Sequence, residues 1–249
     1  MRKVSIVGAG PGAIDLLTQR AINRIKDAEV IVWADSLVSP EIINLAPANC
    51  ELIKSSNLTL EKIMEIIIQR HRQSKKIVRL HDGDPSLYGA ISEQIRLLND
   101  SGIEVEVIPG ISAYQATAAN LKAELTIPNV SQTIVLSRFE GKTGMPESES
   151  LDRLASLKAS LCLYLSARHI EEVEAILLKH YPPETPVAIG YRVSWPDEFL
   201  ELIALKDMAN RSKAKKLFRT TLYIISPALS KNSQRSNLYS PDYNHLFRP

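Results

Sequence analysis

The sequence predicts an α/β fold built from two α/β domains. Three observations lead to this prediction: strand-like and helix-like segments alternate along the chain, a glycine-rich turn follows the first strand, and the alternation resumes after a polar connection. The chain has 249 residues, of which 45% are hydrophobic. That is enough to bury the core of one large domain or two modest ones.

Apolar periodicity places the elements of the first half in order. Strands are predicted at residues 4–7, 29–33, 76–80 and 104–108. Helices are predicted at 16–25 with Asp15 as the N-cap, at 60–72 with Thr59 as the N-cap, and at 86–99. Regular alternation of this kind favours a mainly parallel sheet.

The second half begins with a predicted helix at 112–121 and the polar connection "LKAELTIPNV". Strands are predicted at 133–137, 161–165, 187–192, 200–205 and 221–225, and "GKTGMPESES" reads as an exposed loop. We therefore expect domains at 1–111 and 112–229. The proline-punctuated polar tail, 230–249, is expected to be poorly ordered or wrapped on the surface.

Composition narrows the class of protein. Lys and Arg total 30 against 28 Asp and Glu, which argues against non-specific nucleic-acid binding. The two cysteines form no C-x-x-C pair, so a metal site is not expected, and Cys162 within "LCLYL" reads as a buried apolar residue rather than a nucleophile. No apolar stretch approaches the ~20 residues of a membrane span, and no signal peptide is apparent. We expect a cytoplasmic protein that does not bind membranes.

The glycine-rich turn in "VSIVGAGPGAIDLL" leaves two kinds of ligand open. Gly8, Gly10 and Ala13 fit the G-x-G-x-x-G/A spacing of a dinucleotide-binding turn, and Asp35 follows at about the ~20 residues expected for a ribose contact. However, Pro11 interrupts the loop, and Asp35 could equally cap a turn. A dinucleotide-dependent oxidoreductase and a plain tight turn both remain as alternatives.

A second loop, "RLHDGDPSLYG", places His81, Asp82 and Asp84 at the carboxyl end of a predicted strand. Ligands of open α/β sheets bind at that end. Two carboxylates there would repel a phosphate and would suit hydroxyl groups, amines or a cation. The alternative is that Asp84 and Pro85 only start a turn.

Five motifs in order carry a resemblance to the tetrapyrrole methylase family. They are "VGAGPG", "GDPSLYG", "VEVIPGISA", "PNVSQTIVLSR" followed by "EGKTGMPE", and "PVAIGYRVSWPDE", and the tail "NLYSPDYNHLFRP" is similar too. The resemblance is greatest to the branch that methylates C11 of precorrin-4, with or without cobalt, in cobalamin biosynthesis. It implies S-adenosylmethionine bound in a cleft between the two domains, and usually a homodimer.

The matching motifs carry over a set of site residues. The cofactor would contact Pro11, Asp82, Gly83, Asp84, Leu87, Ser112, Ala113, Leu165, Tyr191, Arg192, Val193 and Thr221. A polycarboxylate tetrapyrrole favours basic partners, and the candidates are His81, Arg138, Lys142 and Arg168, with Arg192 as a further one.

Three positions depart from the family pattern: Asp82 replaces Thr or Ser, Phe139 replaces Thr, and Lys142 replaces Arg. These departures leave the substrate contacts open. No catalytic nucleophile or base is assigned, because methyl transfer from a sulfonium requires orientation above all. A methylase of another ring position or of RNA, and a sensor that binds without turnover, also remain as alternatives.

Overall fold

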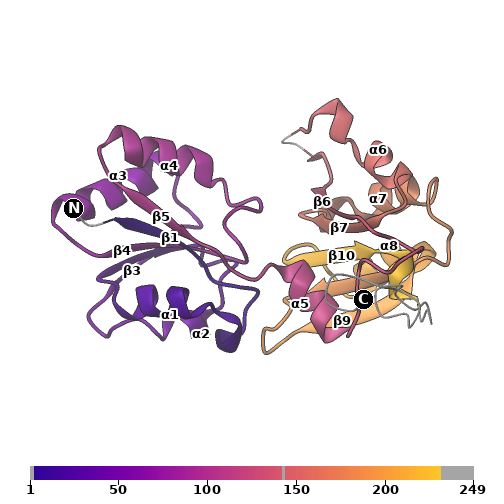
Figure 1. Cartoon of the computed structure of the whole chain (residues 1–249), viewed down its shortest axis with the longest axis horizontal. Helices are drawn as coiled ribbons and strands as arrows, with labels where there is room; N and C mark the ends of the chain where they lie inside the picture. The colour runs from indigo at the N-terminus through magenta and orange to yellow at the C-terminus, as the bar shows by residue number, and fades with distance from the viewer. Residues whose placement is uncertain (1–2, 142–143, 231–249) are drawn as a thin grey trace, which may run out of the picture. The chain divides into compact units, whose positions relative to one another are not determined.

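The computed structural model describes residues 3–141 and 144–230 (Figure 1). The chain forms two compact units. Among the described residues, unit 1 contains 3–116 together with Arg192–Glu198, and unit 2 contains the described parts of 117–191 and residues 199–230. The predicted substrate residue Lys142 and the predicted tail beyond Ser230 lie outside the described residues.

Unit 1 contains a five-stranded sheet in the order β3-β2-β4-β1-β5. The strands are β1 (Val4–Gly8), β2 (Val30–Trp33), β3 (Glu51–Lys54), β4 (Ile77–His81) and β5 (Val105–Ile108). All neighbouring strands are parallel, which confirms the predicted parallel sheet. The carboxyl ends of the strands therefore lie along one edge.

Helices cover both faces of this sheet. They are α1 (Gln19–Lys26), α2 (Pro40–Ile43), α3 (Leu60–Arg72) and α4 (Ile91–Asp100). One core cluster joins α1 and α2 to the sheet, and another joins α3 and α4 to it. Figure 1 shows the two helix pairs on opposite sides of the strands. Burial on both faces explains why β1, β2 and β4 are nearly continuous apolar runs.

The start of the first helix differs from the sequence prediction. Ile14–Leu16 forms a 3₁₀ turn, and α1 begins only at Gln19. The N-cap is Thr18, whose hydroxyl accepts a hydrogen bond from the Ala21 amide at 3.2 Å. Asp15 makes no capping bond and is exposed. Asp15 is thus not the N-cap of this helix.

The helix predicted at 86–99 begins at Ile91 instead. Tyr88 and Ala90 have φ values of +57° and +48°, which lie in the left-handed region and interrupt a right-handed helix. Residues 86–90 therefore form a turn. By contrast, α3 has the predicted bounds and the predicted cap, Thr59.

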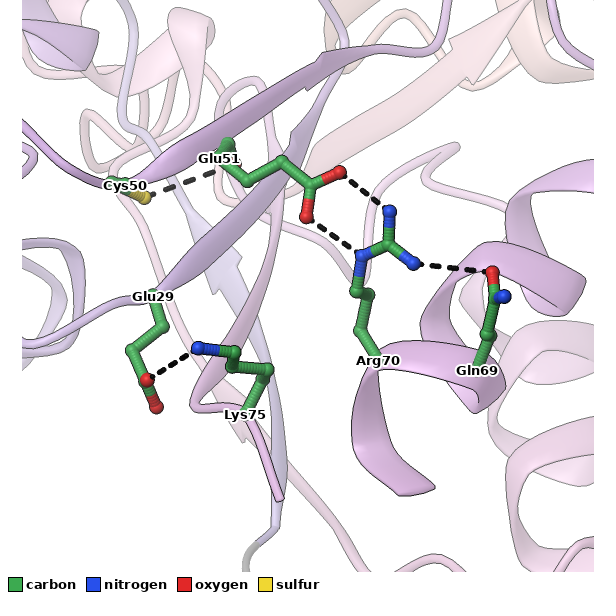
Figure 2. Close-up of polar contacts among 6 residues, drawn as sticks. All are labelled: Glu29, Cys50, Glu51, Gln69, Arg70 and Lys75. Carbon is green, nitrogen blue, oxygen red and sulfur yellow. Dashed lines mark hydrogen bonds and ion pairs between the residues drawn. The ribbon is translucent and has the colours of Figure 1, made fainter. Parts of the chain in front are cut away.

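Strand β3 is short and exposed, and no strand was predicted at these residues. Figure 2 shows how its first residue is held: Glu51 accepts two hydrogen bonds of 2.7 Å from Arg70 of α3. Lys75 forms an ion pair of 3.1 Å with Glu29, just before β2. The Sγ of the neighbouring Cys50 lies 3.8 Å from the Glu51 carbonyl oxygen. The Arg70 contacts fix the first residue of an edge strand that has little apolar surface.

Unit 2 contains a mixed five-stranded sheet in the order β6-β7-β10-β8-β9. The strands are β6 (Ile134–Arg138), β7 (Ser160–Tyr164), β8 (Pro186–Tyr191), β9 (Phe199–Ala204) and β10 (Thr221–Ile225). Only the β6–β7 pair is parallel. The five predicted strands are thus present, each within about a residue of its predicted bounds.

Helices α6 (Leu151–Ser156), α7 (Ile170–Leu177) and α8 (Met208–Ala214) pack in one core cluster with this sheet, whereas α5 (Ala113–Asn120) spans the division between the units. Cys162 is fully buried in β7, and burial raises the pKa of its thiol to about 12. An inert buried thiol is what the sequence predicts at this position.

Candidate functional site

The loops that follow β1, β4 and β5 meet in a glycine junction, which we define as Gly8, Gly10, Gly83 and Gly110. Gly10 and Gly83 exchange two backbone hydrogen bonds, of 3.2 and 2.8 Å, as an isolated antiparallel bridge. The Gly110 amide donates to Oδ2 of Asp84 at 2.9 Å. The carboxyl ends of three strands are thereby tied together at the edge where ligands bind in such sheets.

Close packing explains why the junction consists of glycines. A Cβ on Gly8 would lie 2.7 Å from the Gly83 carbonyl oxygen, and one on Gly110 would lie 2.1 Å from the same atom. Gly10 and Gly83 have φ values of +66° and +55°, which favour glycine. The glycine spacing noted in the sequence therefore reflects contact between loops, rather than approach of a phosphate.

The structure lacks the geometry that a dinucleotide-binding turn requires. That motif requires a helix N-terminus directly after the turn, aimed at a pyrophosphate, but here α1 begins at Gln19, well past Gly10. Asp35 accepts hydrogen bonds of 2.9 and 3.0 Å from the amide and hydroxyl of Ser56. Its carboxylate therefore ties two loops together, a structural contact over 21 residues rather than the local turn cap considered from the sequence.

Asp84 forms the turn that one of its two interpretations expects, and it also contacts a second loop. Its Oδ1 accepts hydrogen bonds from both the amide and the hydroxyl of Ser86, which is the local turn expected from Asp followed by Pro. Its Oδ2 accepts from Gly110, in another loop. Partial burial acts to raise the pKa of Asp84, but the hydrogen bonds from Ser86 and Gly110 outweigh it and lower the pKa. The ionised carboxylate orients the loop.

His81 ends β4 as a buried, neutral group. Burial, with a further contribution from nearby Arg79, lowers the pKa of its imidazole to about 3. Within residues 3–141 and 144–230, Nε2 of His81 has no hydrogen-bond partner. A neutral ring cannot attract a carboxylate by charge, so a role of His81 toward substrate would have to rest on hydrogen bonding.

Arg79 is buried two residues before His81, on the same face of β4. It was not among the predicted site residues. It donates to the Gln94 side chain at 3.2 Å, the Val32 carbonyl at 3.3 Å and the Ser55 hydroxyl at 3.1 Å. Burial lowers the pKa of Arg79 to about 10, and Asp82 opposes this shift. The sequence feature that could have identified Arg79 is its charge within the otherwise apolar run "IVRL". Asp82 is an exposed residue just after β4; partial desolvation of its carboxyl raises the pKa, and Arg79 opposes this shift.

The segment 192–198 packs on the glycine-rich loop of unit 1. The Trp195 indole donates to the Pro11 carbonyl at 3.0 Å, and the Ala13 amide donates to the Ser194 hydroxyl at 3.0 Å. Three residues carried over as cofactor contacts, Pro11, Arg192 and Val193, therefore lie on two segments that contact each other. Ser112 and Ala113 follow Gly110 at the start of α5, and Leu87 lies in the turn held by Asp84.

The remaining candidates gather at one edge of the sheet in unit 2. Tyr191 ends β8 and pairs with Thr221, which begins the neighbouring strand β10. Arg138 ends β6 opposite Tyr164, and Leu165 follows directly with 67% of its surface exposed. The topology thus brings these distant residues to the same edge of the sheet.

The basic candidates differ in how their charge is used. Arg138 donates to the carbonyl oxygens of Phe139, Glu140 and Gly144, and so holds its own loop. Arg192 pairs with Asp197 at 2.5 Å. Arg168 is exposed and has no ion-pair partner within the described parts of the chain.

No helix in the described residues has the length and apolar character needed to cross a bilayer. No group of three or more His, Cys, Asp or Glu side chains is placed to hold a metal ion in residues 3–141 and 144–230.

Comparison with known proteins gives consistent matches over almost the whole chain. Residues 3–209 match the tetrapyrrole (corrin/porphyrin) methylases. The chain is 43% identical to the cobalt-precorrin-4 C(11)-methyltransferase of Methanocaldococcus jannaschii, over 99% of this chain and 96% of that protein. It is 40% identical to the precorrin-4 C(11)-methyltransferase of Pseudomonas aeruginosa, over 99% and 98%.

Solved structures agree with these sequence matches. A cobalamin biosynthetic enzyme, cobalt precorrin-4 methyltransferase, superposes with a TM-score of 0.88 at 36% identity, covering 91% of this chain and 95% of that one. A uroporphyrin-III-C-methyltransferase from Thermus thermophilus gives a TM-score of 0.76 at 25% identity, covering 92% and 96%. Fold and comparisons together define a methyltransferase. The chain belongs to the tetrapyrrole methylase family.

Proposed function

We propose that this protein transfers a methyl group from S-adenosylmethionine to C11 of precorrin-4, with or without cobalt in the ring. The observation that carries the proposal is the similarity, over nearly the full length of each chain, to two enzymes that are named for this reaction. The match to a solved cobalt precorrin-4 methyltransferase adds support from an independent comparison.

The residues of unit 1 fit S-adenosylmethionine better than a dinucleotide. The ionised Asp84 would repel a pyrophosphate but tolerates a sulfonium cation, and the buried Nε2 of His81 offers a polar atom without a partner within the described residues. Pro11, Asp82–Asp84, Ser112 and Ala113 would hold the cofactor on this side. Tyr191, Leu165 and Thr221 are the further cofactor contacts that the family resemblance implies.

When bound, the cofactor supplies a methyl group on a leaving group that is already activated. The contribution of the protein is therefore orientation, which can supply roughly 7–11 kcal/mol of the barrier. The glycine junction gives this edge of unit 1 a fixed backbone, and Asp84 holds it in place through Gly110. Arg168 would attract the carboxylate arms of the macrocycle.

The direct test is to incubate the purified protein with methyl-labelled S-adenosylmethionine and a panel of precorrins, with and without cobalt. We expect one labelled product, with the methyl group at C11 of the precorrin-4 ring by NMR. Methylation at another carbon would replace the proposed specificity and keep the reaction class. No transfer, together with tight binding of NAD by calorimetry, would contradict the proposal as a whole.

A second ring-position specificity is favoured by one observation, the likeness to a uroporphyrin-III-C-methyltransferase at 25% identity. The lower identity and TM-score make it the weaker candidate. The homodimer implied by the family resemblance is part of the proposal, and sedimentation of the purified protein measures it.

A further inference from the structure

Ser194 and Trp195 grip the glycine-rich loop from two sides. The indole Nε1 donates to the Pro11 carbonyl oxygen at 3.0 Å, and the Ser194 hydroxyl accepts from the Ala13 amide at 3.0 Å. Gly12 lies between these two contact points. Trp195 is only 8% exposed, so its large ring is committed to this contact.

The absence of a side chain at Gly12 leaves room for the Trp195 ring. A Cβ at this position would lie 2.3 Å from Cδ1 of the Trp195 ring and 3.1 Å from the Ser194 hydroxyl. Unlike Gly10, Gly12 does not have a positive φ. The backbone conformation therefore does not require glycine here, whereas the indole does.

The 192–198 segment is itself internally braced. Arg192 stacks on the Trp195 ring with its guanidinium carbon 4.0 Å from the centroid, and pairs with Asp197 at 2.5 Å. The Ser194 amide donates to Glu198 at 2.5 Å. Arg192 and Ser194 have φ values of +45° and +65°. Non-glycine residues keep such a conformation only where surrounding contacts impose it.

We propose that the 192–198 segment is a positioning clamp for the cofactor loop. Trp195 and Ser194 would fix the Pro11 carbonyl and the Ala13 amide, so that Pro11, Arg192 and Val193 form one preformed surface for S-adenosylmethionine. Trp195 is then a positioning residue, because it acts through the loop rather than on the reacting atoms. The inference rests on the proposed function, since it assigns these segments to cofactor binding.

The first test removes each contact separately. Trp195→Phe keeps a ring but deletes the indole donor, and Ser194→Ala deletes the acceptor. We expect S-adenosylhomocysteine to bind about tenfold more weakly to Trp195→Phe by calorimetry, which corresponds to about 1.4 kcal/mol. The KM for S-adenosylmethionine should rise by a similar factor, while kcat and the tetrapyrrole KM change little. Ser194→Ala should show the same pattern with a smaller factor.

The chain offers a matched control in its other tryptophan. Trp33 is also buried, but its Nε1 has no hydrogen-bond partner in the described residues. Trp33→Phe therefore makes the same chemical change without breaking a hydrogen bond, and its cofactor affinity should stay within about twofold of the wild type. This variant also leaves Trp195 as the sole tryptophan. Its fluorescence should shift on addition of S-adenosylhomocysteine, a signal that a merely structural ring would not give.

The second test uses the size match. Gly12→Ala should weaken S-adenosylhomocysteine binding because the new methyl group displaces the indole. In the double variant Gly12→Ala/Trp195→Ala the clash is gone. Its fold-loss of S-adenosylhomocysteine affinity should therefore be clearly smaller than the product of the fold-losses measured for Gly12→Ala and Trp195→Ala alone.

The outcomes separate the two proposals. If the wild type does not bind S-adenosylhomocysteine, the proposed function fails and the clamp fails with it. If the wild type binds, but Trp195→Phe and Ser194→Ala bind equally well and Trp195 fluorescence does not respond, the clamp is refuted and the proposed function stands. If Trp195→Phe does not fold, Ser194→Ala and the Trp33→Phe fluorescence decide by the same criteria.

Discussion

Asp84 uses both oxygens of its carboxylate inside unit 1. One accepts from Ser86 in its own turn and the other from Gly110 in a neighbouring loop. The sequence predicted the turn because Asp before Pro favours one. It did not predict the Gly110 contact, because that bond depends on β4 and β5 lying on either side of β1. Asp84 therefore has a structural role that also sets the shape of the candidate site, because it joins two of the loops that form it.

His81 gives a pH dependence of stability. Its folded pKa of about 3 lies below the unfolded value of ~6.5, so the unfolded chain takes up this proton first. The stability contributed by the neutral ring is full above pH ~6.5 and is lost as the pH falls toward 3. Well inside that range, the free energy of unfolding should fall by about 1.4 kcal/mol per pH unit from this group.

The variant His81→Gln removes this titration, so its free energy of unfolding should decline less between pH 6 and 4.5 than that of the wild type. Urea denaturation across this range measures the difference. The wild type is measured beside it in the same urea and buffer series. Parallel slopes for wild type and His81→Gln would mean that His81 is protonated in the folded protein.

Among the elements, those with a strong period were predictable and those held by remote partners were not. Helix α3 has thirteen residues, an apolar face and a capping Thr59, and its bounds were predicted correctly. Strand β3 is exposed and contains no alternating pattern, since Glu51 and Lys54 are polar and its position depends on pairing with β2. The mixed order of the second sheet was likewise not readable from local sequence, because antiparallel β10 inserts between β7 and β8.

Substitutions at the start of α1 distinguish its two possible capping residues. Asp15 and Thr18 are both good capping residues, and only the structure distinguishes them. Because the Thr18 hydroxyl accepts from the Ala21 amide, Thr18→Ala should lower the free energy of unfolding by about 1 kcal/mol. Asp15→Ala should change it by less than about 0.5 kcal/mol. Chemical denaturation of the two variants decides, and equal losses would contradict the assignment of the cap.

Across the whole molecule, the site depends on contacts between segments that are far apart in the chain. The sequence motifs named candidate residues, but local sequence does not show which of them contact one another. Gly12 and Trp195 illustrate this. In the sequence, Gly12 is one glycine of a loop and Trp195 is an aromatic residue far along the chain. Only the fold shows that the Trp195 ring fills the space where a side chain at residue 12 would lie. Arg79 was missed for a related reason, since its partners come from β2, the residue after β3, and α4.

The net charge of the molecule is too small to attract a polyanionic substrate by itself. Its net charge is only +2, so attraction of a polycarboxylate substrate must come from local groups. Of the predicted basic residues described here, Arg192 is neutralised by Asp197, whereas Arg168 is exposed at the edge of the second sheet where Leu165 and Thr221 lie. An exposed charge acts over a Debye length of ~8 Å near physiological salt. The tetrapyrrole KM should therefore rise with ionic strength.

Arg168→Gln should raise that KM several-fold at low salt and remove part of its salt dependence, while affinity for S-adenosylhomocysteine stays unchanged. Lys158→Gln is the matched control, because Lys158 is equally exposed but precedes β7, at the opposite edge of the same sheet. Each variant removes one positive charge, so an effect of net charge alone would be equal in both. Steady-state kinetics at low and high salt separate the cases, and identical behaviour of the two variants would show that Arg168 is an ordinary surface residue.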